Sequence, residues 1–130
     1  MDEYSYKEKV LWIKKIFRQY ASDLSLLQYY HHLNYYPKAK YGLVKETPMS
    51  DTGGYIHEHL DRITMLQKRT QMILKAEEVI GKENYQIVMQ DFFKHEKNWW
   101  MDYYSRATYY RKKREAIDAF LNYMIEAVVF

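Results

Sequence analysis

The sequence contains no cysteine, only two prolines and four glycines. Without cysteine the chain has no disulfide framework, no thiol nucleophile and no thiolate ligands for zinc or iron–sulfur clusters. The scarcity of glycine and proline argues against all-β architectures and glycine-rich nucleotide-binding folds. No apolar run reaches the roughly 18 residues that a membrane span needs, and the charged N-terminus lacks the apolar core of a secretory signal. We therefore expect a cytoplasmic protein with no membrane partner.

The composition that remains is typical of a folded chain. Of the 130 residues, 48% are hydrophobic and 28% are charged, with a net charge of +3, which excludes intrinsic disorder. The length fits one domain or a core with a small appendage. Tyrosine is unusually abundant, at 15 residues. Aromatic side chains stack on bases in single-strand binders, but we expect Trp99 or Trp100 to pack beneath the last helix.

Two long helices are predicted in the first two thirds of the chain. Residues 5–32 carry apolar positions at alternating steps of three and four, the spacing of one helical face; these are Val10, Ile13, Phe17, Tyr20, Leu24, Leu27 and His31. Asp23 is expected to lie off this stripe. A second helix is predicted over 55–80, ended by Gly81. Both prolines and three of the four glycines fall in residues 34–54, which predicts a long loop there.

The last third predicts shorter helices over 83–93 and 96–103, then a third helix over 105–127. No segment alternates with the period of a strand, so the fold class is predicted to be all-α. The predicted organisation is a long-helix scaffold over 1–81, including the loop 34–54, and a three-helix unit over 82–130 packed on it. The unit at 82–130 is expected to be a helix-turn-helix.

The start of the third helix carries the functional argument. Residues 105–114 contain five positive charges and no negative one, and Ser105 is a good N-cap residue. On a helix, apolar and basic side chains separate onto opposite faces: Tyr109, Ala116, Ile117 and Phe120 on one, and Arg106, Tyr110, Arg111 and Arg114 roughly on the other. A short helix and a tight turn come before it, as in a helix-turn-helix whose second helix enters the major groove.

The predicted roles follow from what each part of DNA requires. Phosphates are bound by flexible cations with release of counterions. Base edges are read from the helix N-terminus, where Arg suits guanine and the methyl groups of Ala or Thr suit the thymine methyl. The candidate DNA-binding residues are Arg106, Ala107, Thr108, Tyr110, Arg111, Lys112 and Arg114.

The run Ser-Arg-Ala-Thr-Tyr-Tyr-Arg-Lys-Lys-Arg-Glu-Ala-Ile at 105–117 resembles the recognition helix of ArpU/RinA-type phage late transcription regulators of low-GC Gram-positive bacteria. Those proteins are in turn similar to region four of bacterial sigma factors. The resemblance covers residues 105–117 well and 47–121 loosely. It implies a phage-like transcription regulator that binds promoter DNA. It also implies DNA contacts by Arg106, Thr108, Tyr110 and Arg111, with Tyr109, Ala116 and Ile117 holding the helix on its core.

The sequence departs from that family's pattern just before the recognition helix. Residues 98–104 are rich in aromatic side chains where an Ile-Ala-x-x-Leu-Gly type run is expected, and Tyr104 replaces the usual turn glycine. A bulky residue there requires either a longer turn or an unfavourable left-handed backbone.

Other functions find less support in the sequence. His57 and Asp61 are four residues apart and could share a metal ion, but we expect no metal-binding residues in this chain. No phosphate loop or nucleophile motif is present, so we expect no catalytic residues, no cofactor and no enzyme. The alternative to DNA binding is a helical protein–protein adaptor without a nucleic-acid role. Double-stranded DNA is the predicted partner, with RNA polymerase or a second copy of the chain as candidate protein partners.

Overall fold

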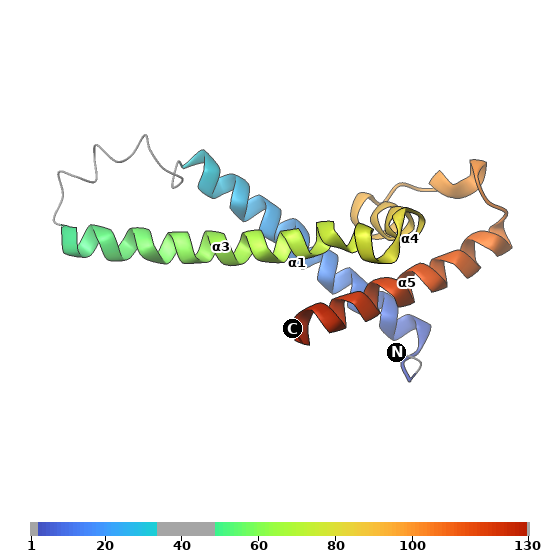
Figure 1. Cartoon of the computed structure of the whole chain (residues 1–130). Helices are drawn as coiled ribbons and strands as arrows, with labels where there is room; N and C mark the ends of the chain where they lie inside the picture. Colours follow the sequence, from blue (N-terminus) through green and yellow to red (C-terminus); the bar gives the residue numbers. More distant parts are fainter. Residues whose placement is uncertain (1–2, 34–48, 130) are drawn as a thin grey trace. The chain divides into compact units, whose positions relative to one another are not determined.

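The computed structural model describes residues 3–33 and 49–129, with side chains described for 3–33 and 59–127. Every regular element in these residues is helical, which confirms the all-α class (Figure 1). The elements are α1 (Tyr6–His32), α3 (Met49–Ile80), α4 (Lys82–Val88), a π-helical turn η1 (Met89–Lys94), a 3-10 turn η2 (Trp99–Asp102) and α5 (Arg106–Val129). Among the described residues, none of these helices combines the length and apolar character needed to cross a membrane.

Most of the predicted helix boundaries are close to the observed ones, but the start of the second long helix differs. Helix α3 begins at Met49, so Gly53 and Gly54 lie inside a helix, and the loop predicted over 34–54 is wrong for positions 49–54. Glycine in a helix interior costs about 1 kcal/mol relative to alanine, which weakens a helix without forbidding it. Positions 34–48 lie outside the described residues.

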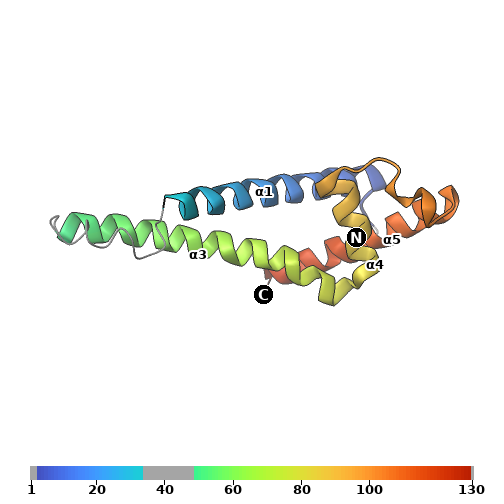
Figure 2. The same cartoon turned by 90° about the horizontal axis from the view of Figure 1, so that it is seen from above.

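The chain turns sharply between α3 and α4 at Gly81 (Figure 2). Gly81 has φ 93° and ψ 156°, a combination that is essentially restricted to glycine. Its amide nitrogen still donates to the carbonyl oxygen of Glu77 at 3.0 Å, closing the last turn of α3. The side-chain amide nitrogen of Asn84, Nδ2, donates to the backbone carbonyl of Ile80 at 2.9 Å. This hydrogen bond satisfies a second carbonyl at the end of α3. The predicted helix stop is confirmed.

Two compact units share the long helices. One unit comprises Met1–Ala21 and Met72–Phe130, and the other comprises Ser22–Gln71. The first unit therefore joins the predicted C-terminal segment to the first part of α1 and the end of α3.

Helix α5 supplies much of the core of the first unit. Phe120 is fully buried and stacks on Phe17 of α1, with ring centroids 5.3 Å apart. Ile87 and Val88 of α4 are also fully buried in this core. The buried side chains of α5 are Tyr109, Ala116, Ile117, Phe120 and Leu121. The apolar face predicted for this helix is confirmed at 109, 116, 117 and 120.

Polar contacts at the edge of this core tie α5 to the two long helices. Lys9 Nζ of α1 lies 2.7 Å from Asp118 Oδ1. The hydroxyl of Tyr123 donates to the backbone carbonyl of Met72 at 2.6 Å. The inner side of α5 is therefore buried in the core, and side chains on its flanks bond to α1 and α3. Its outer side is left for other contacts.

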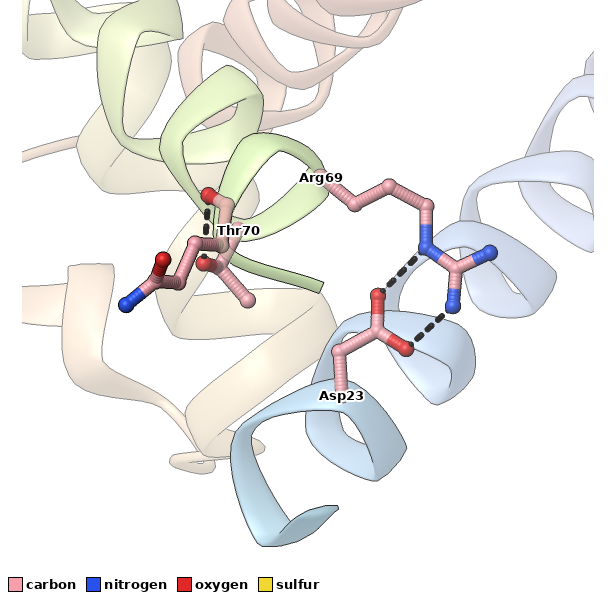
Figure 3. A network of polar contacts seen from close by, with 4 residues as sticks. Asp23, Arg69 and Thr70 are labelled. Carbon is pink, nitrogen blue, oxygen red and sulfur yellow. Dashed lines mark hydrogen bonds and ion pairs between the residues drawn. The ribbon is translucent and has the colours of Figure 1, made fainter. Parts of the chain in front are cut away.

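The second unit has a small core, in which Tyr30 of α1 packs with Ile63 and Leu66 of α3. Asp23 is also buried here, and its carboxylate binds the guanidinium of Arg69 (Figure 3). Leu24 and His31, which the spacing places on the apolar stripe, are exposed instead. Asp23, expected to lie off the stripe, is buried, and its ion pair with Arg69 offsets part of the cost of removing the carboxylate from water.

Candidate nucleic-acid interface

Ser105 caps the N-terminus of α5 as predicted. The backbone amide of Thr108 donates to Ser105 Oγ at 3.3 Å, and Ser105 Oγ donates to Thr108 Oγ1 at 2.9 Å. Such a cap satisfies one of the amides that a helix start leaves without an intrahelical partner. The Thr108 side chain is half-buried and its hydroxyl belongs to the cap. Among the predicted DNA contacts, Thr108 is therefore the one whose side chain bonds directly to the cap residue Ser105.

The segment before α5 differs from the helix predicted over 96–103. It contains one 3-10 turn, Trp99–Asp102. Among the described non-glycine residues, positive φ angles occur at His95 (56°) and Asn98 (55°), and Asn adopts this conformation at lower cost than most residues. The bulky Tyr104 was expected to require either a longer turn or a left-handed backbone. The structure has a longer connection, and the left-handed residues His95 and Asn98 precede Tyr104.

A single carboxylate, that of Asp91, fastens this connection to α5. Asp91 lies in the π-helical turn with its side chain 11% exposed. Its Oδ1 accepts from Trp99 Nε1 at 2.8 Å, and its Oδ2 accepts from the hydroxyl of Tyr109 and lies 3.3 Å from Lys113 Nζ. Three groups from two later elements thus converge on one side chain, and the first turn of α5 is fixed relative to η1.

Aromatic stacking supports the same arrangement. The rings of Trp100 and Tyr109 stack with centroids 4.5 Å apart and planes 8° apart. Trp99 meets the Tyr109 ring edge-on at 5.9 Å. Both tryptophans are half-buried against the core, so the expectation that Trp99 or Trp100 packs beneath the last helix is confirmed.

Two of the five cations at the start of α5 are paired with carboxylates of α4 and η1. Lys113 is held by Asp91. Lys112 Nζ donates to Glu83 Oε1 at 2.9 Å. This hydrogen bond lowers the pKa of the Glu83 carboxyl and raises the pKa of Lys112, because it favours the charged form of both groups.

The remaining three cations are not paired with α4 or η1 in this way. Arg106, Arg111 and Arg114 are exposed. The Arg106 guanidinium lies 5.9 Å from the ring centroid of Tyr110, and the Arg114 guanidinium lies 5.6 Å from that of Tyr6. We call this exposed side of α5 the basic face; its members are Arg106, Ala107, Tyr110, Arg111 and Arg114.

An α-helix with its side chains is about 10–12 Å in diameter, which fits the major groove of B-DNA, about 12 Å wide. Arg106 and Arg114 are eight residues apart, so the basic face extends about 12 Å along the helix axis. The positive end of the helix dipole lies at the Arg106 end of this face, which adds to its attraction for phosphate.

Two exposed apolar side chains in the segment before α5 were not singled out in the sequence. Met101 is 60% exposed and Tyr103 is 71% exposed, both at the 3-10 turn that precedes α5. The signal that could have identified them is local, since a 3-10 turn too short to form an apolar face leaves some of its large side chains in solvent.

Searches with the whole chain found no matching family model, no matching curated protein and no matching solved structure. Among the described residues, no group of three or more metal-ligating side chains comes together. The His57 side chain lies outside the described part, so the pair with Asp61 is not placed.

Proposed function

We propose that this protein binds double-stranded DNA through the basic face of α5 and acts as a phage-like transcription regulator. One observation carries the proposal: three arginines and no acidic residue lie exposed in a helix start, Arg106 to Arg114, which the buried Tyr109 anchors in the core. Phosphate binding needs cations that solvent and DNA can reach, and the three guanidiniums meet that requirement.

In this proposal α5 is the recognition helix, and α4 with η1 supports it from behind. The connection over 95–105 takes the place of the short helix and tight turn of a helix-turn-helix. Arg106 at the helix start is placed to reach base edges, and Arg111 and Arg114 are placed to bind phosphates. The resemblance of residues 105–117 to ArpU/RinA-type regulators supports the same assignment. Such a regulator would act in the cytoplasm.

A direct test is a fluorescence anisotropy titration of the whole chain with labelled duplexes at low salt. We expect binding that weakens steeply as salt is raised, because counterions compete for the phosphates. Arg111→Ala should weaken binding, whereas Lys75→Ala, which removes one exposed positive charge from α3, should have a much smaller effect. A flat titration at tens of micromolar protein would remove the proposal.

A protein–protein adaptor is the second candidate, and the pairing of Lys112 and Lys113 favours it. These ion pairs reduce the free positive charge at the start of α5. Exposed apolar side chains elsewhere, such as Leu11, Leu74 and Val79, offer surface for a protein partner. The titration separates the two candidates, since an adaptor predicts no salt-dependent binding to any duplex.

A further inference from the structure

The Glu83 carboxylate of α4 holds Lys112, a cation on the flank of α5 that faces α4. Its Oε1 accepts from Lys112 Nζ at 2.9 Å, and its Oε2 accepts from the hydroxyl of Tyr104 at 3.2 Å. The Lys112 ammonium also lies 5.8 Å from the centroid of the Tyr104 ring. The ammonium is thus held by a carboxylate and an aromatic ring.

This cluster is more open to solvent than the ion pair of Lys113 with Asp91. The side chains of Glu83 and Lys112 are 54% and 26% exposed. Those of Asp91 and Lys113 are 11% and 19% exposed, and Asp91 also binds Trp99 and Tyr109. Exposed ion pairs hold their partners weakly. Lys112 can therefore exchange its partner, whereas Lys113 is fixed in the fold.

A DNA phosphate would have to take the place that Glu83 now occupies. Carboxylate and phosphate oxygens both accept charge-assisted hydrogen bonds from an ammonium group. If Lys112 turns to a phosphate, Glu83 loses its cation and remains as a negative charge near the DNA backbone. If Lys112 stays with Glu83, the protein makes one phosphate contact fewer. Either outcome lowers affinity for a duplex of any sequence.

We propose that Glu83 is an internal competitor of DNA phosphate for Lys112 and thereby limits the affinity of α5 for DNA. The inference rests on the proposed function and adds to it a residue, on another helix, that sets its strength. Because the competition involves phosphate and not base edges, it acts equally on all sequences and raises the relative weight of base contacts in target choice.

The test compares three full-length proteins in anisotropy titrations with a labelled duplex of randomised sequence. Glu83→Gln keeps the size of the side chain and removes its charge. The matched control is Glu126→Gln, an exposed position on the same helix as Lys112. It changes the net charge equally but lies 14 residues further on, about 21 Å along the axis and beyond the screening distance of about 10 Å.

We expect Glu83→Gln to bind more tightly than the wild type, and Glu126→Gln to match the wild type. One additional phosphate contact steepens the dependence of log K on log salt by about 0.9, which corresponds to up to about eightfold in affinity near 0.1 M salt. In a Lys112→Gln background, Glu83→Gln should gain clearly less than it does in the wild type, since the cation that it releases is absent and only the repulsion by Glu83 is removed.

The possible results separate the two proposals. If the wild type binds the duplex and Glu83→Gln shows the affinity and salt dependence of Glu126→Gln, the competition is refuted while DNA binding stands. An equal gain in the Lys112→Gln background also refutes it, because the effect would then be general repulsion. If none of the proteins binds at low salt, DNA binding itself is refuted and the competition with it. Circular dichroism of each variant verifies that the helices are retained.

Discussion

The guanidinium of Arg69 donates two hydrogen bonds to the carboxylate of Asp23. Arg69 Nη2 lies 2.7 Å from Asp23 Oδ1, and Arg69 Nε lies 2.9 Å from Asp23 Oδ2. The Asp23 side chain is only 2% exposed, whereas that of Arg69 is 41% exposed. Planar two-point pairing of this kind fixes direction as well as distance, so the pair sets how α1 and α3 align within their shared unit.

Removing the arginine should cost more than removing an ordinary surface cation. Arg69→Ala deletes both of these hydrogen bonds to a buried carboxylate, and we expect a loss of about 2 kcal/mol, below the roughly 3–5 kcal/mol for fully buried pairs because water reaches Arg69. Urea denaturation measures the change. Arg62→Ala, an exposed arginine on the same helix, should stay within about 0.5 kcal/mol of the wild type. Equal losses in the two variants would contradict the structural role of the pair.

Neutralising Asp91 should loosen the connection before α5. An asparagine at this position cannot serve Trp99 Nε1, the Tyr109 hydroxyl and Lys113 Nζ together, because one of its two terminal atoms is a donor. We expect Asp91→Asn to lose about 1–3 kcal/mol of stability and to shift the indole N–H resonance of Trp99. Asp102→Asn, at an exposed carboxylate of the 3-10 turn, is the control and should leave that resonance in place.

A side chain at position 81 should strain the junction between α3 and α4. An added Cβ would meet no atom within 4 Å, so the penalty of Gly81→Ala comes from its backbone angles alone, about 1–3 kcal/mol. Thermal unfolding measures it, and Lys82→Ala at the exposed neighbouring position is the control. A Gly81→Ala protein as stable as the control would show that the junction adopts other angles in solution.

Stability should fall at alkaline pH. Burial raises the pKa of Tyr20 and of Tyr85 above the usual 10.0, because the core disfavours the phenolate. The folded state then keeps protons that the unfolded state has released, so this contribution is complete below pH 10 and is lost as pH rises through the raised pKa values. Tyr20→Phe should flatten the decline in melting temperature above pH 10. A decline as steep as that of the wild type would assign it to other groups.

Base contacts and phosphate contacts on α5 should respond differently to substitution. Arg106→Ala should reduce discrimination between duplexes, because a base contact is lost, whereas Lys112→Ala should weaken binding to all of them alike. The loss from Lys112→Ala should be smaller than that from Arg114→Ala, since Lys112 is already paired with Glu83 in the free protein. Parallel titrations with a set of duplexes measure both effects. A uniform loss from Arg106→Ala would exclude base readout by that residue.

The sequence was sufficient to predict the long helices and most of the core, because periodicity and capping are local properties. Ile13 and Phe17 on α1, Gly81 at the end of α3 and Ser105 before α5 were all placed correctly. Their roles depend on neighbours within a turn or two of the same helix.

The contacts that shape the candidate site depended on pairing between distant segments. Burial of Asp23 requires an arginine 46 positions away, and the partner of Lys112 lies 29 positions before it. No periodic pattern encodes such partners. The helix predicted over 96–103 is only a 3-10 turn at Trp99–Asp102. The connection there is held by Asp91, which accepts from Trp99 and Tyr109.

Because of the π-helical turn at Met89–Lys94, losing or gaining one residue there would change the helical position of the residues that follow. Turns of this kind accommodate one residue more than an α-helix would. Deleting one residue there would rotate everything beyond it by about 100° around the helix axis, carrying either Asp91 or Phe92 away from its present surroundings. A lineage could thus re-aim the loop that precedes α5 by gaining or losing one amino acid, with every later side chain kept intact.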